Sequence, residues 1–587
     1  MNITILYGSE TGTAQDVAEQ IWKSLQSNVS SMDDYDIQNL VSENIMVFVV
    51  ATTGQGDPPN NMRRFWKFLL QKNLPLNILS NVKYGVLGLG DSSYQKFNFA
   101  AKKLNKRLSQ LSGKELLPIG LADDQHDLGI DAVVDSWVQE LWKKIANIFS
   151  ISTTNISNRQ NHVIERFNVS IVDDKDINSI SNIDCQNIDI YMHEVSVKDE
   201  LKVGTVLENM RTTSKDHFQD VRLIKIQSPN IMYEPGDIMY VRPKNSTKQV
   251  ERFFNILHDN NVQIHPDTML QICEKEIRVP DVLKQNLTLR QIVEQYWDLS
   301  FKPRRSTMKT LSLISENNLE KEKLHEFTTP SGQEELYNYV NRPRRNILEV
   351  LADFPHTTSK LNIQLLFEIM SPIKPRAFSI ASSIRSTKDE LHILVAVVKY
   401  KTKLVEPRYG LCSNWLATVK EGDKIIFWIQ KGTFSFKYDK PMILIGPGTG
   451  VAPFRSLLLD KMALNQNLNN CILVFGCRNK EKDYHCKNDF EYFSQEYNLK
   501  LFCAFSRDQE NKVYVQHVIW NQRELCWELL QKNANIYLAG NSKNMPDCVR
   551  KEFVHLVKEM GKLTEKEAEN FITQMEKNNR YQSETWG

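Results

Sequence analysis

The sequence lacks any apolar run near the about 20 residues that a helix needs to cross a bilayer. Its nine cysteines are scattered, odd in number and never spaced as C-x-x-C, which argues against a disulfide scaffold and against a zinc site. The sequence also lacks the large excess of basic residues that is typical of proteins that bind nucleic acid or anionic membranes, since its net charge is only +2. Strand-like Ile3–Tyr7 stands at the start, where a signal peptide or anchor would lie. We therefore expect a reduced, cytoplasmic protein with no metal site.

The composition is that of a large globular protein. Its 587 residues are 41% hydrophobic and 25% charged, enough for several domains with large cores. Residues 1–147 and 438–587 alternate short apolar runs with helical patterns, which predicts a parallel α/β domain at each end. Residues 148–198, rich in Asn, Ser, Ile and Asp, suit a flexible linker. Residues 199–437 carry short strand patterns typical of an antiparallel barrel, with amphipathic stretches at about 250–350 that predict a helical insertion.

The strand and helix patterns can be placed residue by residue. In the N-terminal domain they are the strands Ile3–Tyr7, Met46–Ala51 and Tyr84–Leu89 and a last helix at Val133–Phe149. The barrel pattern runs from Leu201 to Tyr240 and again from Leu365 to Lys437. In the C-terminal domain the predicted strands are Met442–Ile445, Cys471–Phe475, Leu501–Phe505 and Ile536–Leu538.

Loops after the N-terminal strands carry candidate ligand-binding residues, because ligands of open α/β sheets bind beyond the carboxyl ends of strands. The first loop opens a helix, so its hydroxyl and N–H groups can wrap a phosphate at the positive helix end. It lacks the lysine of a P-loop, which makes a nucleoside triphosphate a poor fit. Glycines in the second and third loops let the backbone approach a flat ring, and Tyr94 can stack on it. A fourth loop offers a carboxylate to a sugar hydroxyl.

The candidates in these four loops are Ser9, Glu10, Thr11, Gly12, Thr13, Ala14; Ala51, Thr52, Thr53, Gly54; Leu87, Gly88, Leu89, Gly90, Asp91, Ser92, Ser93, Tyr94, Gln95, Lys96; and Asp123, Asp124. Taken alone, Ser9–Ala14 also fits an ordinary helix N-cap with turn glycines, and Tyr94 fits a core or surface aromatic. Together the loops resemble the flavodoxin-like domain over nearly all of residues 1–147. That resemblance implies a bound FMN.

A second flavin motif lies in the barrel region. The string Arg376, Ala377, Phe378, Ser379 resembles the R-x-Y-S motif of the ferredoxin-reductase family, with Phe where Tyr is usual. The resemblance implies that the Arg376 guanidinium binds the FAD pyrophosphate, that Phe378 stacks on the isoalloxazine, and that Ser379 hydrogen-bonds near its reactive nitrogen. The lost tyrosine hydroxyl is expected to weaken FAD binding modestly.

Two further segments match FAD contacts of that family. Gly410, Leu411, Cys412 and Ser413 resemble its second pyrophosphate loop. Arg344 matches another family contact, but the cluster Arg342–Arg345 fits a solvated basic patch equally well.

The C-terminal domain carries a nucleotide motif of the same family. Gly446–Gly450, with Thr449 and the following Pro453, resembles its NADP-binding turn. After the third predicted strand come Ser506, Arg507 and then Lys512, Val513, Tyr514, Val515, Gln516, which resemble a cradle for the adenosine 2′-phosphate. An NAD enzyme usually offers a carboxylate to the ribose there. Arg507 and Lys512 alone would fit an exposed charged turn; beside the glycine loop they favour NADPH.

The last residues complete the pattern. Glu584 and Trp586 match the acidic and terminal aromatic residues of the family's diflavin members. The resemblance implies that Trp586 covers the flavin and moves aside for nicotinamide, while Glu584 and Ser379 position hydride transfer and stabilise the protonated reduced flavin. There are two departures. Ala539 stands where some relatives place a cysteine, and Cys548 stands where relatives carry an Asp, with Asp547 just before it.

Over its whole length the chain resembles the diflavin reductases, relatives of the microsomal haem-monooxygenase reductase. The resemblance implies that electrons pass from NADPH to FAD, to FMN and then to an outside acceptor, with a domain movement about the linker. It is most similar to the branch that serves cytosolic iron–sulfur cluster assembly, which implies the iron–sulfur protein anamorsin as acceptor. Two alternatives stay open: a general donor to haem monooxygenases or cytochrome b5, and a flavin-bearing scaffold with vestigial catalysis.

Acidic residues of the N-terminal domain can form a docking face for the acceptor, although such runs are more often a solvated helix face and its loop. They are Asp123, Asp124, Asp127, Asp131, Asp135 and Glu140.

Overall fold

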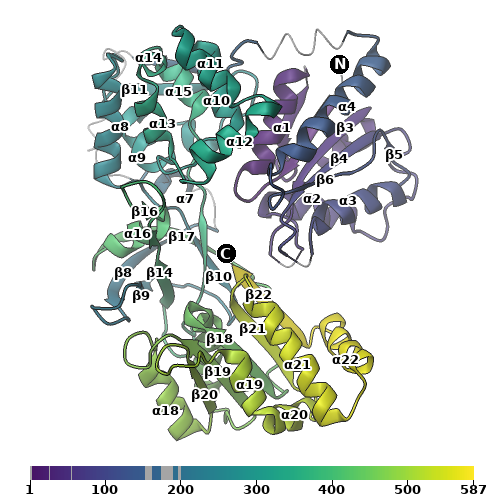
Figure 1. Ribbon diagram of the computed structural model, residues 1–587, viewed down its shortest axis with the longest axis vertical. Helices are drawn as coiled ribbons and strands as arrows, with labels where there is room; N and C mark the ends of the chain where they lie inside the picture. Colours follow the sequence, from purple (N-terminus) through teal and green to yellow (C-terminus); the bar gives the residue numbers. More distant parts are fainter. Residues whose placement is uncertain are drawn as a thin grey trace. The chain divides into compact units, whose positions relative to one another are not determined.

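The structure is a computed structural model that describes residues 3–25, 27–54, 56–94, 96–152, 161–172, 189–195 and 200–586 (Figure 1). Two compact units make up the chain. The first consists of residues 1–190, 244–374 and 402–405, and the second of residues 191–243, 375–401 and 406–587. Gln95 and three parts of the predicted linker, 153–160, 173–188 and 196–198, lie outside the described residues.

The first unit contains a parallel sheet with strand order β2-β1-β3-β4-β5, and β6 pairs with β4. Helices α1 and α4 cover one face of this sheet and α2 and α3 the other, each over its own hydrophobic cluster. The buried strands read as continuous apolar runs because both faces are covered. The strands are β1 (Ile3–Gly8), β2 (Asn28–Ser31), β3 (Ile45–Ala51), β4 (Lys83–Gly90), β5 (Lys114–Glu115) and β6 (Gly120–Asp123). The helices are α1 (Thr13–Ser24), α2 (Arg63–Leu69), α3 (Phe99–Gln110) and α4 (Asp131–Phe149). The flavodoxin-like prediction is confirmed.

The same unit contains a helical region. Three of its helices begin with capping boxes, in which an N-cap side chain and a residue three positions on satisfy each other's backbone N–H groups; the N-caps are Ser246, Thr288 and Asn346. The helices are α8 (Thr247–Asp259), α9 (Leu289–Gln295), α10 (Arg305–Ile314), α11 (Asn318–Glu326), α12 (Gln333–Leu336), α13 (Ile347–Asp353), α14 (Pro355–Thr358) and α15 (Ile363–Ile369). The barrel pattern predicted from Leu365 is therefore wrong at its start, because Asn362 caps a helix there instead.

Part of the predicted linker is ordered as a strand. Residues Phe167–Ile171 form β7, which pairs antiparallel with β11 (Met269–Glu274), and β11 also pairs with β12 (Leu287–Thr288). The expectation of weak structure throughout 148–198 is not met at this strand. Its sequence does alternate, with Phe167, Val169 and Ile171 separated by Asn168 and Ser170, but only over five residues inside a stretch rich in Asn, Ser, Ile and Asp.

The second unit contains an antiparallel sheet with strand order β13-β10-β17-β8-β9-β14. An isolated bridge between Ile380 and Ile393 joins its two outer strands, and one hydrophobic cluster fills the space against the sheet. The strands are β8 (Lys202–Arg211), β9 (Asp220–Gln227), β10 (Ile238–Val241), β13 (Arg376–Ser379), β14 (Glu390–Val397) and β17 (Lys424–Gln430). Beside them lie α7 (Met192–Val195), the pair β15 (Lys399–Tyr400) and β16 (Arg408–Tyr409), and α16 (Leu411–Thr418).

The second unit also contains a parallel sheet of order β20-β19-β18-β21-β22, in which all four predicted strands are found. The strands are β18 (Met442–Pro447), β19 (Cys471–Cys477), β20 (Lys500–Phe505), β21 (Asn535–Asn541) and β22 (Tyr581–Trp586). The helices are α17 (Ala452–Ala463), α18 (Lys487–Tyr497), α19 (Val515–Asn521), α20 (Arg523–Gln531), α21 (Met545–Gly561) and α22 (Glu565–Lys577). Within the described part of the chain, we find no helix both long and apolar enough to span a membrane.

A buried carboxylate on α17 ties the two sheets of the second unit together. Asp460 is fully buried and accepts hydrogen bonds from the hydroxyls of Ser383 and Tyr438, each at 2.7 Å. The Arg385 guanidinium binds both of its oxygens, at 2.8 and 2.7 Å. A buried charge is tolerated only when it is paired in this way.

Replacing Arg385 by Ala is expected to lower the free energy of unfolding by about 3 kcal/mol, because the Asp460 carboxylate keeps its burial and loses its cation. Arg385→Lys should lose less, since the charge stays. The matched control is Lys532→Ala, whose ion pair with Glu528 is exposed to solvent and should contribute little to stability. Thermal unfolding of the purified variants measures the difference; equal midpoints for Arg385→Ala and Lys532→Ala would contradict the assignment.

Candidate functional site

The loop between β1 and α1 in the first unit is held in a shape suited to an anion. Gly12 has φ +93°, and its N–H donates to the Ser9 hydroxyl at 3.1 Å. The Ser9 N–H in turn donates to Asn61 Oδ1 at 2.8 Å. Glu10 turns toward Asn60, whose backbone and side-chain N–H groups donate to its carboxylate at 3.0 and 2.8 Å. Thr11 stays exposed at the start of the helix, where N–H groups attract a phosphate.

Two cations from the helical region lie beside this loop, and sequence reasoning missed both. The Arg304 guanidinium donates to the carbonyl of Thr11 at 3.3 Å, and Lys374 Nζ donates to the side chain of Gln15 at 3.2 Å. A Cβ atom placed on Gly12 would stand 3.2 Å from Lys374 Cε. Nothing in the local sequence indicates this meeting, because the two pairs of partners are 293 and 359 residues apart. Hydroxyls, helix N–H groups and cations together fit the phosphate of FMN.

The last residues of β4 show why glycines are needed there. A Cβ atom on Gly88 would stand 2.9 Å from Oδ1 of Asn98, and one on Gly90 would stand 2.8 Å from it. Asn98 is fully buried, and its Nδ2 donates to the carbonyl of Ala122 at 3.0 Å. These glycines therefore serve packing against Asn98, a residue that sequence reasoning missed. Tyr94 is half-buried in the loop that follows β4.

Asp123 and Asp124 differ in their surroundings. Asp123 Oδ1 accepts hydrogen bonds from the N–H groups of Ser92 and Gln125 at 2.8 and 3.0 Å. Burial raises the pKa of Asp123, but hydrogen bonds from Ser92 and Gln125 outweigh it and leave the pKa below its ordinary value. Asp123 thus braces the loop after β4, and exposed Asp124 is the better candidate for a sugar hydroxyl.

The predicted FAD residues of the second unit meet around α16. In β13, Phe378 and Ser379 pair with Met239 and Ile238 of β10. Burial raises the pKa of the Cys412 thiol to about 12, and the nearby positive charge of Arg376 opposes that rise. Arg376 therefore lies near the N-terminus of α16, which begins directly after Gly410. A guanidinium beside a helix N-terminus fits a pyrophosphate.

Arg344 is placed in the first unit, in a left-handed backbone conformation with φ +56°. Its proposed FAD contact stays a prediction.

The predicted NADP turn follows β18 and leads into α17. Gly448 has φ +57°, and a Cβ atom on Gly450 would stand 2.2 Å from the carbonyl oxygen of Ala539 in β21. Only glycine permits this approach. Thr449 is half-buried between these two glycines.

The residues predicted to hold the 2′-phosphate lie after β20. The N–H groups of Ser506 and Arg507 donate to the carbonyls of Cys477 and Arg478 at 2.9 and 2.8 Å, so the loops after β19 and β20 lie side by side. Arg507, Lys512 and Tyr514 are exposed, and α19 begins at Val515. Ser506 is buried at 8% exposure, which leaves the two cations as the main anion-binding groups. Arg478, missed from sequence, adds a third cation and stacks over Phe218 at 4.3 Å.

Three polar residues of the second unit converge on the predicted hydride-transfer site. The Ser379 hydroxyl donates to Oε1 of Glu584 at 3.3 Å, and the Thr433 hydroxyl donates to Oε2 at 2.9 Å. Burial raises the pKa of Glu584 above its ordinary value, and the hydrogen bonds from Thr433 and Ser379 oppose the rise. The structure thus brings Ser379 and Glu584 together, and it adds Thr433.

The neighbours of this cluster on the sheet are also defined. In the pairing of β21 with β22, Ala539 stands opposite Glu584 and Asn541 opposite Trp586. The Trp586 side chain is 38% exposed at the end of the strand. Cys548 lies half-buried in the first turn of α21, next to the exposed Asp547.

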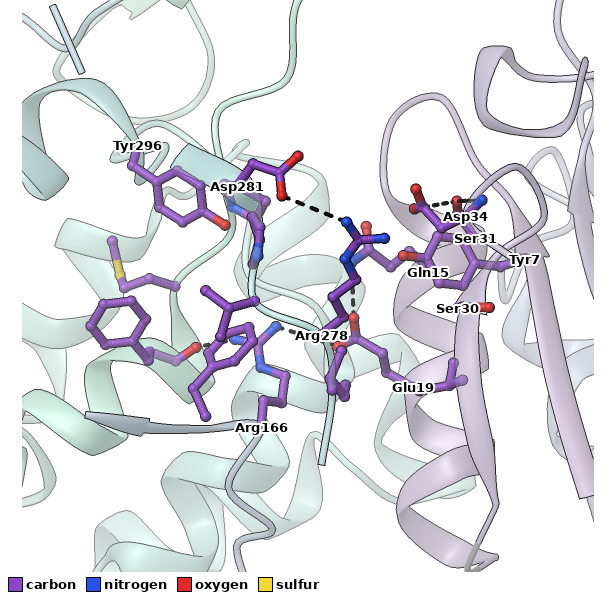
Figure 2. A pocket seen from close by; sticks show the side chains of 18 of the residues that line it. Tyr7, Gln15, Glu19, Ser30, Ser31, Asp34, Arg166, Arg278, Asp281 and Tyr296 are labelled. Atoms are coloured by element: carbon purple, nitrogen blue, oxygen red, sulfur yellow. Dashed lines mark hydrogen bonds and ion pairs between the residues drawn. The ribbon is translucent and has the colours of Figure 1, made fainter. Parts of the chain in front are cut away.

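A cavity of about 270 Å³ lies elsewhere, in the first unit (Figure 2). None of the predicted flavin-loop residues lines it. Two charged side chains in its wall, Arg166 and Glu19, lie 3.4 Å apart, and Arg166 also pairs at 3.2 Å with the neighbouring Glu368. Burial also raises the pKa of Tyr7 in its wall. We assign this cavity to packing between α1 and the helical region.

Comparison with known proteins identifies the same three domains. Family models match in chain order: flavodoxin over residues 5–137, FAD binding domain over 205–415, and oxidoreductase NAD-binding domain over 444–551. A Xenopus laevis protein named NADPH-dependent diflavin oxidoreductase 1 is 43% identical over the whole chain and 99% of its own length. Proteins of the same name from Bos taurus and Schizosaccharomyces pombe are 41% and 35% identical over the same shares.

Similarity of this extent over the full length, with all three domain models in order, establishes the relationship. The chain belongs to the family of NADPH-dependent diflavin oxidoreductases, enzymes that carry FMN and FAD and transfer electrons from NADPH.

Proposed function

We propose that this diflavin oxidoreductase delivers its electrons to an iron–sulfur protein of the anamorsin type, in cytosolic iron–sulfur cluster assembly. Supporting this is the sequence resemblance to the cytosolic branch of the family. A haem monooxygenase or cytochrome b5 as acceptor is the second candidate.

We further propose a role for each group at the nicotinamide end. The single observation that carries it is the meeting of Ser379, Thr433 and Glu584, in which both hydroxyls donate to the one carboxylate. Bound flavins supply the redox chemistry, since they accept a hydride and release electrons singly. The chain's own groups do the rest: Ser379 and Glu584 fix the reacting region, and Trp586 covers it until nicotinamide enters.

The binding groups are proposed on charge and geometry. Arg376 and the N-terminus of α16 hold the FAD pyrophosphate, and Arg507 with Lys512 holds the 2′-phosphate of NADPH. In the first unit, the loop Ser9–Ala14 holds the FMN phosphate. The intact set of groups weighs against a scaffold with vestigial catalysis.

The acidic face proposed for acceptor docking is smaller than the sequence indicates. Asp135 binds the Arg305 guanidinium at 2.7 and 2.6 Å. Glu140 pairs with Lys143 at 3.4 Å. Burial raises the pKa of Asp131 to about 6, against the lowering effect of Arg305. Exposed Asp124 and Asp127 remain as docking candidates.

Replacing Arg507 and Lys512 together by Ala is expected to weaken NADPH binding about 100-fold, because two charge-assisted contacts to the 2′-phosphate are lost. NADH binding should change less than about threefold, since that nucleotide lacks the phosphate. Titration of each nucleotide by calorimetry measures this. Arg523→Ala, which removes a guanidinium stacked on Trp520 elsewhere in the sheet domain, is the control. Equal losses of affinity for NADPH and NADH would contradict the assignment of Arg507 and Lys512 to the 2′-phosphate.

Anaerobic mixing of the enzyme, NADPH and oxidised anamorsin should bleach the cluster absorbance within seconds. Cytochrome c reduction in the same preparation serves as the control for electron transfer. Reduction of cytochrome c without bleaching of anamorsin would keep the reductase and exclude this acceptor.

Locking the flavodoxin-like domain onto the helical region should block acceptor reduction if that domain must move. Asp135→Cys with Arg305→Cys, joined by a short bifunctional thiol reagent, introduces the lock where these side chains now pair. Reduction of FAD by NADPH should be unchanged, as measured by stopped-flow absorbance. Each single variant and the wild type, treated with the same reagent, are controls; unchanged acceptor reduction in the locked protein would make the movement unnecessary.

A further inference from the structure

The strand that carries Glu584 presents its functional residues on one side. Side chains two apart in a strand share a face, so Gln582, Glu584 and Trp586 of β22 project together. The segment after β17, residues 432–435, runs beside that face. It contacts two of these three side chains through different groups.

The contacts between the segment and β22 form a clip. The Thr433 hydroxyl donates to Oε2 of Glu584 at 2.9 Å. Two residues along, the Ser435 N–H donates to Gln582 Oε1 at 2.8 Å, and Gln582 Nε2 donates back to the Ser435 carbonyl at 3.2 Å. The first bond ends on the carboxylate itself, whereas the second pair only joins the backbone to β22.

The position of Thr433 is fixed from behind. A Cβ atom on Gly432 would stand 1.9 Å from the carbonyl oxygen of Gly236, so the segment rests directly on the turn before β10. On the other side of Thr433, Phe434 is buried and packs against the rings of Phe454 and Tyr537, at centroid distances of 5.7 and 5.8 Å. Thr433 is thus exposed at its tip but held on both sides.

The same turn also fixes Ser379. It leads into β10, whose Ile238 pairs with Ser379 of β13, and the Ile380 N–H donates to the Asp237 carbonyl at 3.1 Å. One turn therefore sets the places of both hydroxyls that bind Glu584. Each hydroxyl takes a different carboxylate oxygen, Oε1 for Ser379 and Oε2 for Thr433.

We propose that Thr433 is a positioning residue of the hydride-transfer site, which holds the Glu584 carboxylate in one plane between its own hydroxyl and that of Ser379. The inference rests on the role proposed above for Glu584. A carboxylate bonded at one oxygen can rotate about its last torsion, and donors on both oxygens stop that rotation.

The surroundings of Glu584 support this assignment. Burial raises its pKa, while hydrogen bonds from the Thr433 side chain, from Ser379 and from the Thr433 backbone lower it. Among the described residues, no salt bridge reaches Glu584, so hydrogen bonds are what offset its burial. Removing a donor to the charged form favours the protonated form.

The test is Thr433→Val, which keeps the shape and removes the hydroxyl, with Thr433→Ser as the variant that restores it. Gln582→Ala is the matched control, because it opens the clip without touching Glu584. FAD content and the flavin absorbance spectrum establish that each variant binds its cofactors; if Thr433→Val does not, Thr433→Cys, a weak donor, takes its place.

Two readouts are measured on oxidised and NADPH-reduced enzyme. One is the pH dependence of FAD reduction by stopped flow, and the other is the carboxyl band in infrared difference spectra, assigned by its loss in Glu584→Gln. Each readout gives a midpoint, the pH of half-maximal change in the rate of FAD reduction or in the intensity of the carboxyl band. Thr433→Val should move both midpoints upward by about one pH unit and slow FAD reduction about tenfold at neutral pH. Thr433→Ser and Gln582→Ala should stay within about twofold and 0.3 pH unit of the wild type.

The proposal is overturned if Thr433→Val leaves both midpoints in place, or if Gln582→Ala shifts them equally, which would make the clip structural only. If Glu584→Gln alters neither the rate of FAD reduction nor its pH profile, the proposed role of Glu584 is wrong, and the inference about Thr433 is excluded with it. If Glu584→Gln alters them and Thr433→Val does not, only Thr433 is excluded.

Discussion

At two places in the second unit, backbone rests directly on backbone with no room for a side chain. A Cβ atom on Gly450 would stand 2.2 Å from the carbonyl oxygen of Ala539, and one on Gly432 would stand 1.9 Å from that of Gly236. Neither position can therefore carry a side chain. The first contact seats the nucleotide turn on the strand beside Glu584, and the second seats Thr433 on the turn that leads to Ser379. The geometry of the site depends on these two contacts. Thr433 belongs to one of the four backbone segments involved, Glu584 stands opposite Ala539, and Ser379 pairs with the strand that follows Gly236.

Sequence patterns predicted the apolar parallel strands β1, β3, β4 and β18 to β21 to within a few residues, since buried strands leave continuous apolar runs. The strands β2, β5, β6 and β22 of the same sheets were not predicted. The loops after those strands were found for the same reason. Asn98, Arg304, Lys374, Thr433 and Gln582 were not found. Each acts through a partner distant in sequence, and only the register between elements brings the pair together. The residues around each of these positions do not indicate such a pairing.

Two further differences have physical causes. Strand β7 alternates apolar and polar residues over only five positions within a polar stretch, and it was taken as linker. Helix α15 carries buried apolar residues that a strand would also carry, and its start is decided by the cap of Asn362. The acidic run of the N-terminal domain was seen, but its engagement by Arg305 depends on a helix 170 residues away.

The pairing of β7 with β11 changes how the flavodoxin-like domain is tethered. Helix α4 ends at Phe149 and β7 begins at Phe167, so only 167 − 149 = 18 peptide steps connect the domain to the helical region. Even fully extended, such a tether reaches no more than about 65 Å. Within that radius the domain encounters the helical region at an effective concentration in the millimolar range, far above that of a free partner. An acceptor protein must therefore compete with the covalently attached helical region for the surface of the flavodoxin-like domain. The length of the connection between Phe149 and Phe167 sets how strong that competition is.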